Sequence, residues 1–241
     1  MKILAIESSG LAASAAVLSD GILAGEYTIN HKKTHSQTLL PMIDEVIRML
    51  EIDLSELDGI AVSGGPGSFT GLRIGSATAK GLGLALDIPL MEVPTTEVLA
   101  YNLYDAAGLV CPVMDARRDQ VYTGIFRYND HELATVMEQK PMAFKKLADM
   151  LNRMGESVIF TGDGTGVHRQ HMEELLTCPW SIAPPHLNLQ KAGALAVLGE
   201  KYLRSGKTVS AAAHRPDYLR LSQAERERLE REAKAGKEDM K

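Results

Sequence analysis

The sequence contains few cysteines, few aromatic residues and no long apolar run. Its two cysteines, Cys111 and Cys178, exclude the disulfide framework of a small secreted domain and predict free thiols in a reducing compartment. No segment reaches the roughly 18 apolar residues of a membrane-spanning helix. Lys2 is followed by only four apolar residues before Glu7, which is too short for a signal peptide. We therefore expect a cytoplasmic protein that does not span a membrane.

Basic residues are not in excess either. The chain has 26 lysines and arginines against 31 aspartates and glutamates, which gives a net charge of −5. A protein that holds nucleic acid by itself usually presents a basic face. The overall acidity argues against that class, although a local basic patch is compatible with it.

The glycine-rich segment Ser63–Gly75 lacks the specific patterns of nucleotide loops. No window there supplies the Walker pattern Gly-x-x-x-x-Gly-Lys-Ser/Thr, and Gly65-Pro-Gly67 is followed by Ser-Phe-Thr rather than by the rest of Gly-x-Gly-x-x-Gly. The Gly-x-Ser-x-Gly elbow of serine hydrolases is also absent. Two readings stay open: an anion site at a helix N-terminus, or a structural turn in which Ser68 or Thr70 caps the helix.

Histidine pairs at helical spacing do not make a convincing metal site. His31 and His35 are four residues apart and His168 and His171 are three apart, but neither pair has the glutamate of a His-Glu-x-x-His motif. We interpret them as surface or capping histidines and expect no metal and no cofactor.

The expected elements occur in the same order twice. Hydrophobic patterns predict strands at 2–7, 13–19, 22–29, 59–63 and 90–93 and helices at 37–51, 70–86 and 95–104 in the first half. The second half repeats this with strands at 109–114, 121–128, 133–138, 157–161 and 181–183 and helices at 143–154, 167–176 and 190–204. This order predicts an α/β protein with two mixed-sheet βββαβαβα halves that face each other across a cleft.

We expect domains at 1–104 and 105–220, followed by a charged helical or frayed tail at 221–241.

The helix predicted at 70–86 carries Gly71, Gly75, Ala79 and Gly83, each four residues from the next. Residues four apart are neighbours on a helix surface, so these positions form a stripe with almost no side chain. An interior glycine costs about 1 kcal/mol relative to alanine. We interpret the stripe as a surface that another helix approaches closely.

Charged residues stand at the end of the first strand of each half. Glu7 precedes the turn Ser8-Ser9, and Asp115 precedes Arg117 and Arg118. These six residues are the candidates for a vestigial nucleotide or anion site, or they simply start two turns.

Several of these motifs together resemble the bacterial TsaB (YeaZ) family of the actin/Hsp70/sugar-kinase superfamily. The longest is Ser63-Gly-Gly-Pro-Gly-Ser-Phe-Thr-Gly-Leu-Arg-Ile-Gly75, and Ile6-Glu-Ser-Ser9, Asp115-Ala-Arg-Arg118 and Pro216-Asp-Tyr-Leu-Arg220 agree with it. The resemblance covers the chain to about residue 220 and implies a duplicated ribonuclease-H-like (actin-like ATPase) fold.

The resemblance also implies a function. TsaB proteins are non-catalytic dimerisation subunits in the synthesis of N6-threonylcarbamoyladenosine on tRNA, where they bind and activate the catalytic paralogue TsaD together with the ATPase TsaE. TsaD binds its metal through a His-x-x-x-His helix; the corresponding segment here, Thr95–Tyr101, contains no histidine. We expect contact with tRNA only within the complex, and a homodimer through the same helices when the partner is missing.

Two helices should form the partner interface. The predicted interface residues are Leu39, Met42, Ile43, Val46, Met49, Gly71, Arg73, Gly75, Thr78, Ala79, Leu82 and Gly83. The rival functions are an ATP-dependent small-molecule kinase of the same superfamily, which needs intact phosphate loops, and a metal-dependent protease.

Overall fold

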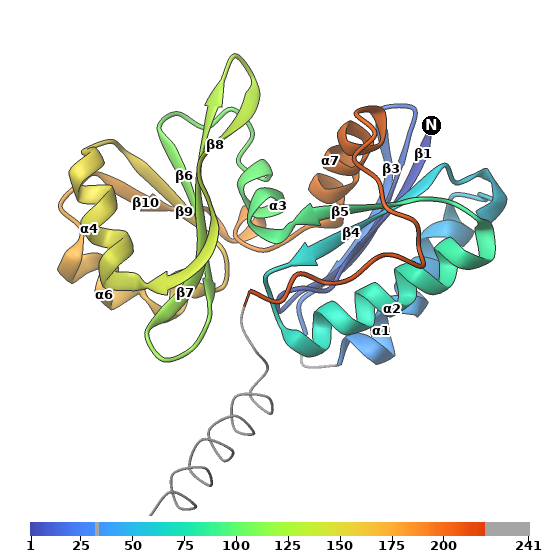
Figure 1. Ribbon diagram of the computed structural model, residues 1–241, viewed down its shortest axis with the longest axis horizontal. Helices are drawn as coiled ribbons and strands as arrows, with labels where there is room; N and C mark the ends of the chain where they lie inside the picture. The colour runs from blue at the N-terminus through green and yellow to red at the C-terminus, as the bar shows by residue number, and fades with distance from the viewer. Residues whose placement is uncertain (32–33, 220–241) are drawn as a thin grey trace, which may run out of the picture.

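The computed structural model describes residues 1–31 and 34–219, which form two mixed five-stranded sheets (Figure 1). The strand orders are β3-β2-β1-β4-β5 and β10-β9-β6-β7-β8. In each sheet the first three strands along the chain pair antiparallel, and the next two add in parallel beside the first. The two sheets therefore share one topology, which confirms the predicted duplicated ribonuclease-H-like fold of the α/β class.

The elements lie close to their predicted positions. The first half contains β1 (Lys2–Glu7), β2 (Ala13–Ser19), β3 (Ile22–Ile29), α1 (His35–Met49), β4 (Gly59–Gly65), α2 (Phe69–Leu86), β5 (Leu90–Pro94) and α3 (Thr95–Tyr101). The second half contains β6 (Leu109–Asp115), β7 (Gln120–Asn129), β8 (Glu132–Ala143), α4 (Phe144–Met154), β9 (Val158–Thr161), α5 (Gly164–Val167), α6 (Arg169–Leu175), β10 (Trp180–Ile182) and α7 (Ala192–Arg204). Short 3₁₀ turns occur at Leu54–Glu56 and Pro185–Leu187.

Helices cover both faces of the first sheet, as its sequence requires. β1 and β4 are almost continuously apolar, which is typical of central strands that are buried on both sides. The amphipathic helices α1 and α2 bury their apolar sides on one face, and α7 packs on the other (Figure 1). Within the described ranges, no helix is long and apolar enough to cross a lipid bilayer.

The last helix does not pack where the repeated order predicts. α7 was expected in the domain 105–220, but its residues Ala192, Leu195 and Leu198 are buried with Ile3 and Ala61 of the first sheet. The assignment of 105–220 to one domain is therefore wrong at its C-terminal end, because the apolar face of α7 completes the first core. The predicted tail at 221–241 lies outside the described residues.

After α7 the chain returns along the edge of the first sheet. We call residues 205–219 the C-terminal strap. Val209 and Leu90 exchange two backbone hydrogen bonds of 2.9 Å, and the Asp217 amide donates to the Gly64 carbonyl oxygen at 2.7 Å. The strap therefore pairs with β5 and then reaches the end of β4 beside α2 (Figure 1).

Candidate partner interface

The apolar side of α1 is part of the core of its own sheet. Leu39, Met42, Ile43 and Val46 are between 1% and 6% exposed and pack in one cluster with residues of β1, β2 and β4. Of the α1 residues predicted at the interface, Met49 is on the surface, with 67% of its side chain exposed. The prediction that the other four contact a partner is wrong, because they are covered by this chain.

The glycine stripe of α2 also faces inward. A Cβ atom on Gly71 would lie 2.0 Å from the carbonyl oxygen of Ser8, and one on Gly75 would lie 2.3 Å from the Ser8 hydroxyl. A Cβ on Gly83 would lie 2.9 Å from the Cβ of Ala211 in the strap. The predicted close approach is present, but the approaching segments belong to this chain. The interpretation of Gly71, Gly75, Ala79 and Gly83 as a bare surface for another protein is therefore wrong.

A second row of small residues lies on the outside of α2. Ala77, Gly81 and Ala85 are exposed, and a Cβ on Gly81 would meet nothing within 4 Å. Their four-residue spacing repeats that of the buried stripe. The sequence therefore shows two rows of small residues on this helix, but the spacing alone does not determine which row faces outward.

Three large apolar side chains are also exposed on α1 and α2. Leu84 on α2 is 60% exposed, and Leu40 and Met49 on α1 are 56% and 67% exposed. Exposed large apolar side chains on a helix pair are typical of a protein-binding surface. We call the set Leu40, Met49, Ala77, Gly81, Leu84 and Ala85 the outer α1–α2 face. Arg73 is also exposed on α2, whereas Thr78 and Leu82 are half-buried.

Glu7 lies at the end of β1 and is fully buried. Its Oε1 accepts hydrogen bonds from the Ser9 amide at 2.7 Å and the Ser9 hydroxyl at 2.5 Å, and its Oε2 accepts one from the Ser63 hydroxyl. Burial raises the pKa of Glu7, while the bonds from Ser63 and Ser9 oppose that rise. The carboxyl group thus ties the turn after β1 to β4.

The turn after β1 does not fit a nucleotide phosphate. A phosphate site needs backbone N–H groups that point at the ligand, but the Ser9 amide is bonded to Glu7. A Cβ on Gly10 would lie 2.5 Å from the amide of Gln190, so that side chain lies directly on the turn. At α2 the Ser68 hydroxyl accepts from the Gly71 amide at 3.2 Å, which confirms the capping alternative.

The second candidate group forms the turn between β6 and β7. The Asp115 carboxylate accepts from the Arg117 amide at 2.7 Å, and Arg117 and Arg118 have φ of 60° and 55°. The Asp115 amide donates in turn to the carboxylate of Asp163 at 3.3 Å, and burial raises the pKa of Asp163. The hydrogen bonds of the Asp115 carboxylate and amide are therefore to Arg117 and Asp163, both in the second half of the chain.

Three of the four paired histidines, His35, His168 and His171, have local partners. His35 Nε2 lies 2.9 Å from the Gly10 carbonyl oxygen. The His168 ring stacks on Phe144 with centroids 5.1 Å apart, and its Nδ1 lies 3.4 Å from that of His171. In the part of the chain that the structure describes, no three His, Cys, Asp or Glu residues are placed to hold a metal ion.

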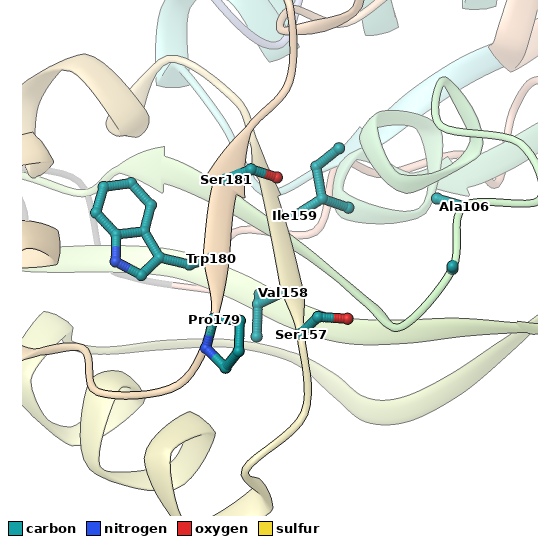
Figure 2. A pocket seen from close by; sticks show the side chains of 8 residues that line it. Ala106, Ser157, Val158, Ile159, Pro179, Trp180 and Ser181 are labelled. Carbon is teal, nitrogen blue, oxygen red and sulfur yellow. The ribbon is translucent and has the colours of Figure 1, made fainter.

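A surface hollow of about 330 Å³ lies at the edge of the second sheet (Figure 2). Pro179, Trp180 and Ser181 line it together with Ile159 and Ala106, and the indole of Trp180 points away from Ala106. Its remaining lining residues are Ala107, Ser157 and Val158. None of these residues carries a charge, so the hollow offers no acid, base or metal ligand.

The comparison with known proteins identifies the family. A family model described as tRNA N6-adenosine threonylcarbamoyltransferase (TsaD) matches residues 23–228. The tRNA threonylcarbamoyladenosine biosynthesis protein TsaB of Bacillus subtilis is 34% identical over 230 residues, which cover 95% of this chain and 99% of that protein. The chain belongs to the TsaB family. TsaB of Escherichia coli is 32% identical over 133 residues, or 54% of this chain and 57% of that protein.

Solved structures agree with this assignment. YeaZ from Pseudomonas aeruginosa superposes with a TM-score of 0.77 at 26% identity, and covers 90% of this chain and 99% of that one. A second structure from the same organism, described as similar to the peptidase YEAZ, gives a TM-score of 0.78 at 27% identity over 91% of this chain and 99% of the other.

The helix that the resemblance associates with the TsaD metal has a structural role in this chain. The Thr96 hydroxyl on α3 donates to Gln139 at 2.9 Å, and Glu97 accepts from the Tyr202 hydroxyl at 2.7 Å. α3 contains no histidine, and its side chains connect it to β8 and α7.

Proposed function

We propose that this TsaB-family chain is a non-catalytic dimerisation subunit in the threonylcarbamoyladenosine modification of tRNA. It binds and activates a TsaD-like catalytic paralogue and works with a TsaE-like ATPase, in the cytoplasm. It meets tRNA only in that complex, and it forms a homodimer through the same helices in isolation.

The outer α1–α2 face carries the proposal. Its apolar side chains Leu40, Met49 and Leu84 are exposed on the two helices that cover one face of the first sheet. On α2, Gly81 and its small neighbours let the backbone of a partner helix approach closely. We therefore place the contact with the paralogue on this face rather than on the inward stripe first expected.

The absence of a catalytic role rests on two observations. The turn after β1 is filled by Gln190 and internally hydrogen-bonded, which disfavours the kinase alternative. The histidine-free α3 disfavours a TsaD-like metal chemistry, and with it the protease alternative.

Substitution of Gly81 by leucine tests the interface. The new side chain projects into open space, so the chain folds while the partner helix is held away. Gly166→Leu is the matched control, because Gly166 is also exposed with nothing within 4 Å of a Cβ and lies on α5 in the second half. Leucine at Gly75, which would strike Ser8, is unsuitable because it disrupts the fold itself.

The measurement is co-purification with the TsaD-like partner, followed by a tRNA modification assay. We expect Gly81→Leu to lose both the complex and the stimulation of modification, and Gly166→Leu to keep both. A complex that survives Gly81→Leu with full stimulation would place the interface elsewhere. Modification activity of the chain alone would overturn the non-catalytic role.

A further inference from the structure

Two aromatic rings hold an arginine at the start of α2. Phe69 and Tyr218 stack with ring centroids 4.1 Å apart and an angle of 19° between their planes. The guanidinium carbon of Arg73 lies 4.6 Å from the Phe69 centroid and 5.9 Å from that of Tyr218. Arg73 Nε also donates to the Tyr218 hydroxyl at 3.4 Å. Because Tyr218 belongs to the strap, two distant segments of the chain fix this guanidinium; we call the three residues the aromatic corner.

The outer donors of Arg73 have no partner in the part of the chain that the structure describes. A guanidinium carries five N–H donors in a planar fork, and four of them are on the two Nη atoms. Within residues 1–31 and 34–219, no hydrogen bond or ion pair engages the Nη groups of Arg73, and the residue is exposed. A fork that is already held on a ring loses less conformational entropy when it binds than a free arginine does.

The aromatic corner continues the outer α1–α2 face. Arg73, Ala77 and Gly81 follow one another at four-residue spacing, so they share one side of α2. A partner helix that lies along Gly81 and Ala77 therefore passes the guanidinium at the N-terminal end of α2.

We propose that Arg73 binds a carboxylate of the TsaD-like partner through its two Nη groups, at the rim of the outer α1–α2 face. This inference rests on the function proposed above. The matching geometry of a guanidinium and a carboxylate gives two parallel hydrogen bonds. A protein carboxylate fits better than an RNA backbone, because the net charge of −5 repels a polyanion more strongly than it repels a single carboxylate.

Three variants test the fork. Arg73→Ala removes it, Arg73→Lys keeps the charge without the bidentate geometry, and Tyr218→Phe keeps the ring stack but removes the hydroxyl that accepts from Nε. Affinity for the purified TsaD-like partner is measured by calorimetry, and circular dichroism checks that each variant is folded. We expect a loss of about tenfold or more for Arg73→Ala, a loss nearly as large for Arg73→Lys, and about two- to threefold for Tyr218→Phe.

The outcomes separate this inference from the proposed function. If Gly81→Leu abolishes binding while Arg73→Ala stays within twofold of the unchanged chain, the interface stands and the carboxylate contact is overturned. If neither change affects binding, both proposals fail. Full affinity of Arg73→Lys would overturn the bidentate contact. A variant Arg73→Ala that keeps its partner affinity but weakens tRNA binding by the assembled complex would assign the fork to a phosphate instead.

Discussion

Alanine substitutions at Gly75 and Gly81 should change the stability of this protein in opposite directions, although both glycines lie inside α2. Alanine in a helix interior is favoured over glycine by about 1 kcal/mol at either position. At Gly81 the added methyl group meets nothing within 4 Å, so the whole gain remains. For a protein of this size, that gain raises the melting temperature by about 2–4 °C.

At Gly75 the methyl group would lie 2.3 Å from the Ser8 hydroxyl. That hydroxyl is buried and donates to the Gly71 carbonyl oxygen at 2.8 Å, so it moves only by breaking this bond. Overpacking costs about 1–3 kcal/mol and the lost hydrogen bond about 1 kcal/mol. Against the gain in helix propensity, we expect Gly75→Ala to be destabilised by about 1–3 kcal/mol.

Thermal and urea unfolding of both variants, followed by circular dichroism, measure the effect. The double variant Ser8→Ala/Gly75→Ala removes the atom that the methyl group meets, and should recover most of the loss in a double-mutant cycle. If Gly75→Ala is stabilised as much as Gly81→Ala, the inward stripe does not pack on Ser8 and the assignment of the two sides of α2 is wrong.

Three further changes have defined outcomes. Burial raises the pKa of Glu7, so the folded state binds a proton on this carboxyl group more tightly than the unfolded state does. Protonated Glu7 therefore stabilises the folded state below about pH 4, and this contribution is lost as the pH rises through the folded-state pKa. The free energy of unfolding of the unchanged chain relative to Glu7→Gln should therefore fall as the pH rises above about 4 in denaturant titrations, and a constant difference would contradict this. Burial raises the pKa of Cys111 to about 12, so iodoacetamide at pH 8 should label Cys111 only after unfolding. Rapid labelling of Cys111 in the folded protein would refute its burial. A leucine side chain at Gly83 would overlap Ala211 and Leu90. We expect it to displace the strap, so that limited proteolysis cleaves within residues 205–219. An unchanged cleavage pattern would show that other contacts hold the strap in place.

The order and bounds of the elements could be predicted because hydrophobic periodicity is local. The expected helix at 70–86, for example, is observed at Phe69–Leu86, and the first three strands begin and end at the expected residues. The topology followed from the same order, since three antiparallel strands followed by βα units allow few sheets.

Which side of a helix is buried and which is exposed could not be predicted from local periodicity. Gly71, Gly75 and Gly83 share their spacing with Ala77 and Gly81, and only packing against the turn after β1 and the strap decides which row is buried. The placement of α7 failed for a related reason. Its apolar face fits either sheet, and the choice depends on contacts across most of the chain length.

The return of α7 and the strap to the first sheet has a consequence for biosynthesis. The strands β1 to β5 are synthesised early, but α7, which covers the second face of their sheet, is synthesised after all strands of the second sheet. The nascent first half therefore presents the side of β1 and β4 that carries Ile3 and Ala61 to solvent or to chaperones until α7 has been synthesised. The half that is synthesised first is completed last, so a truncated product is an aggregation hazard rather than a smaller working domain.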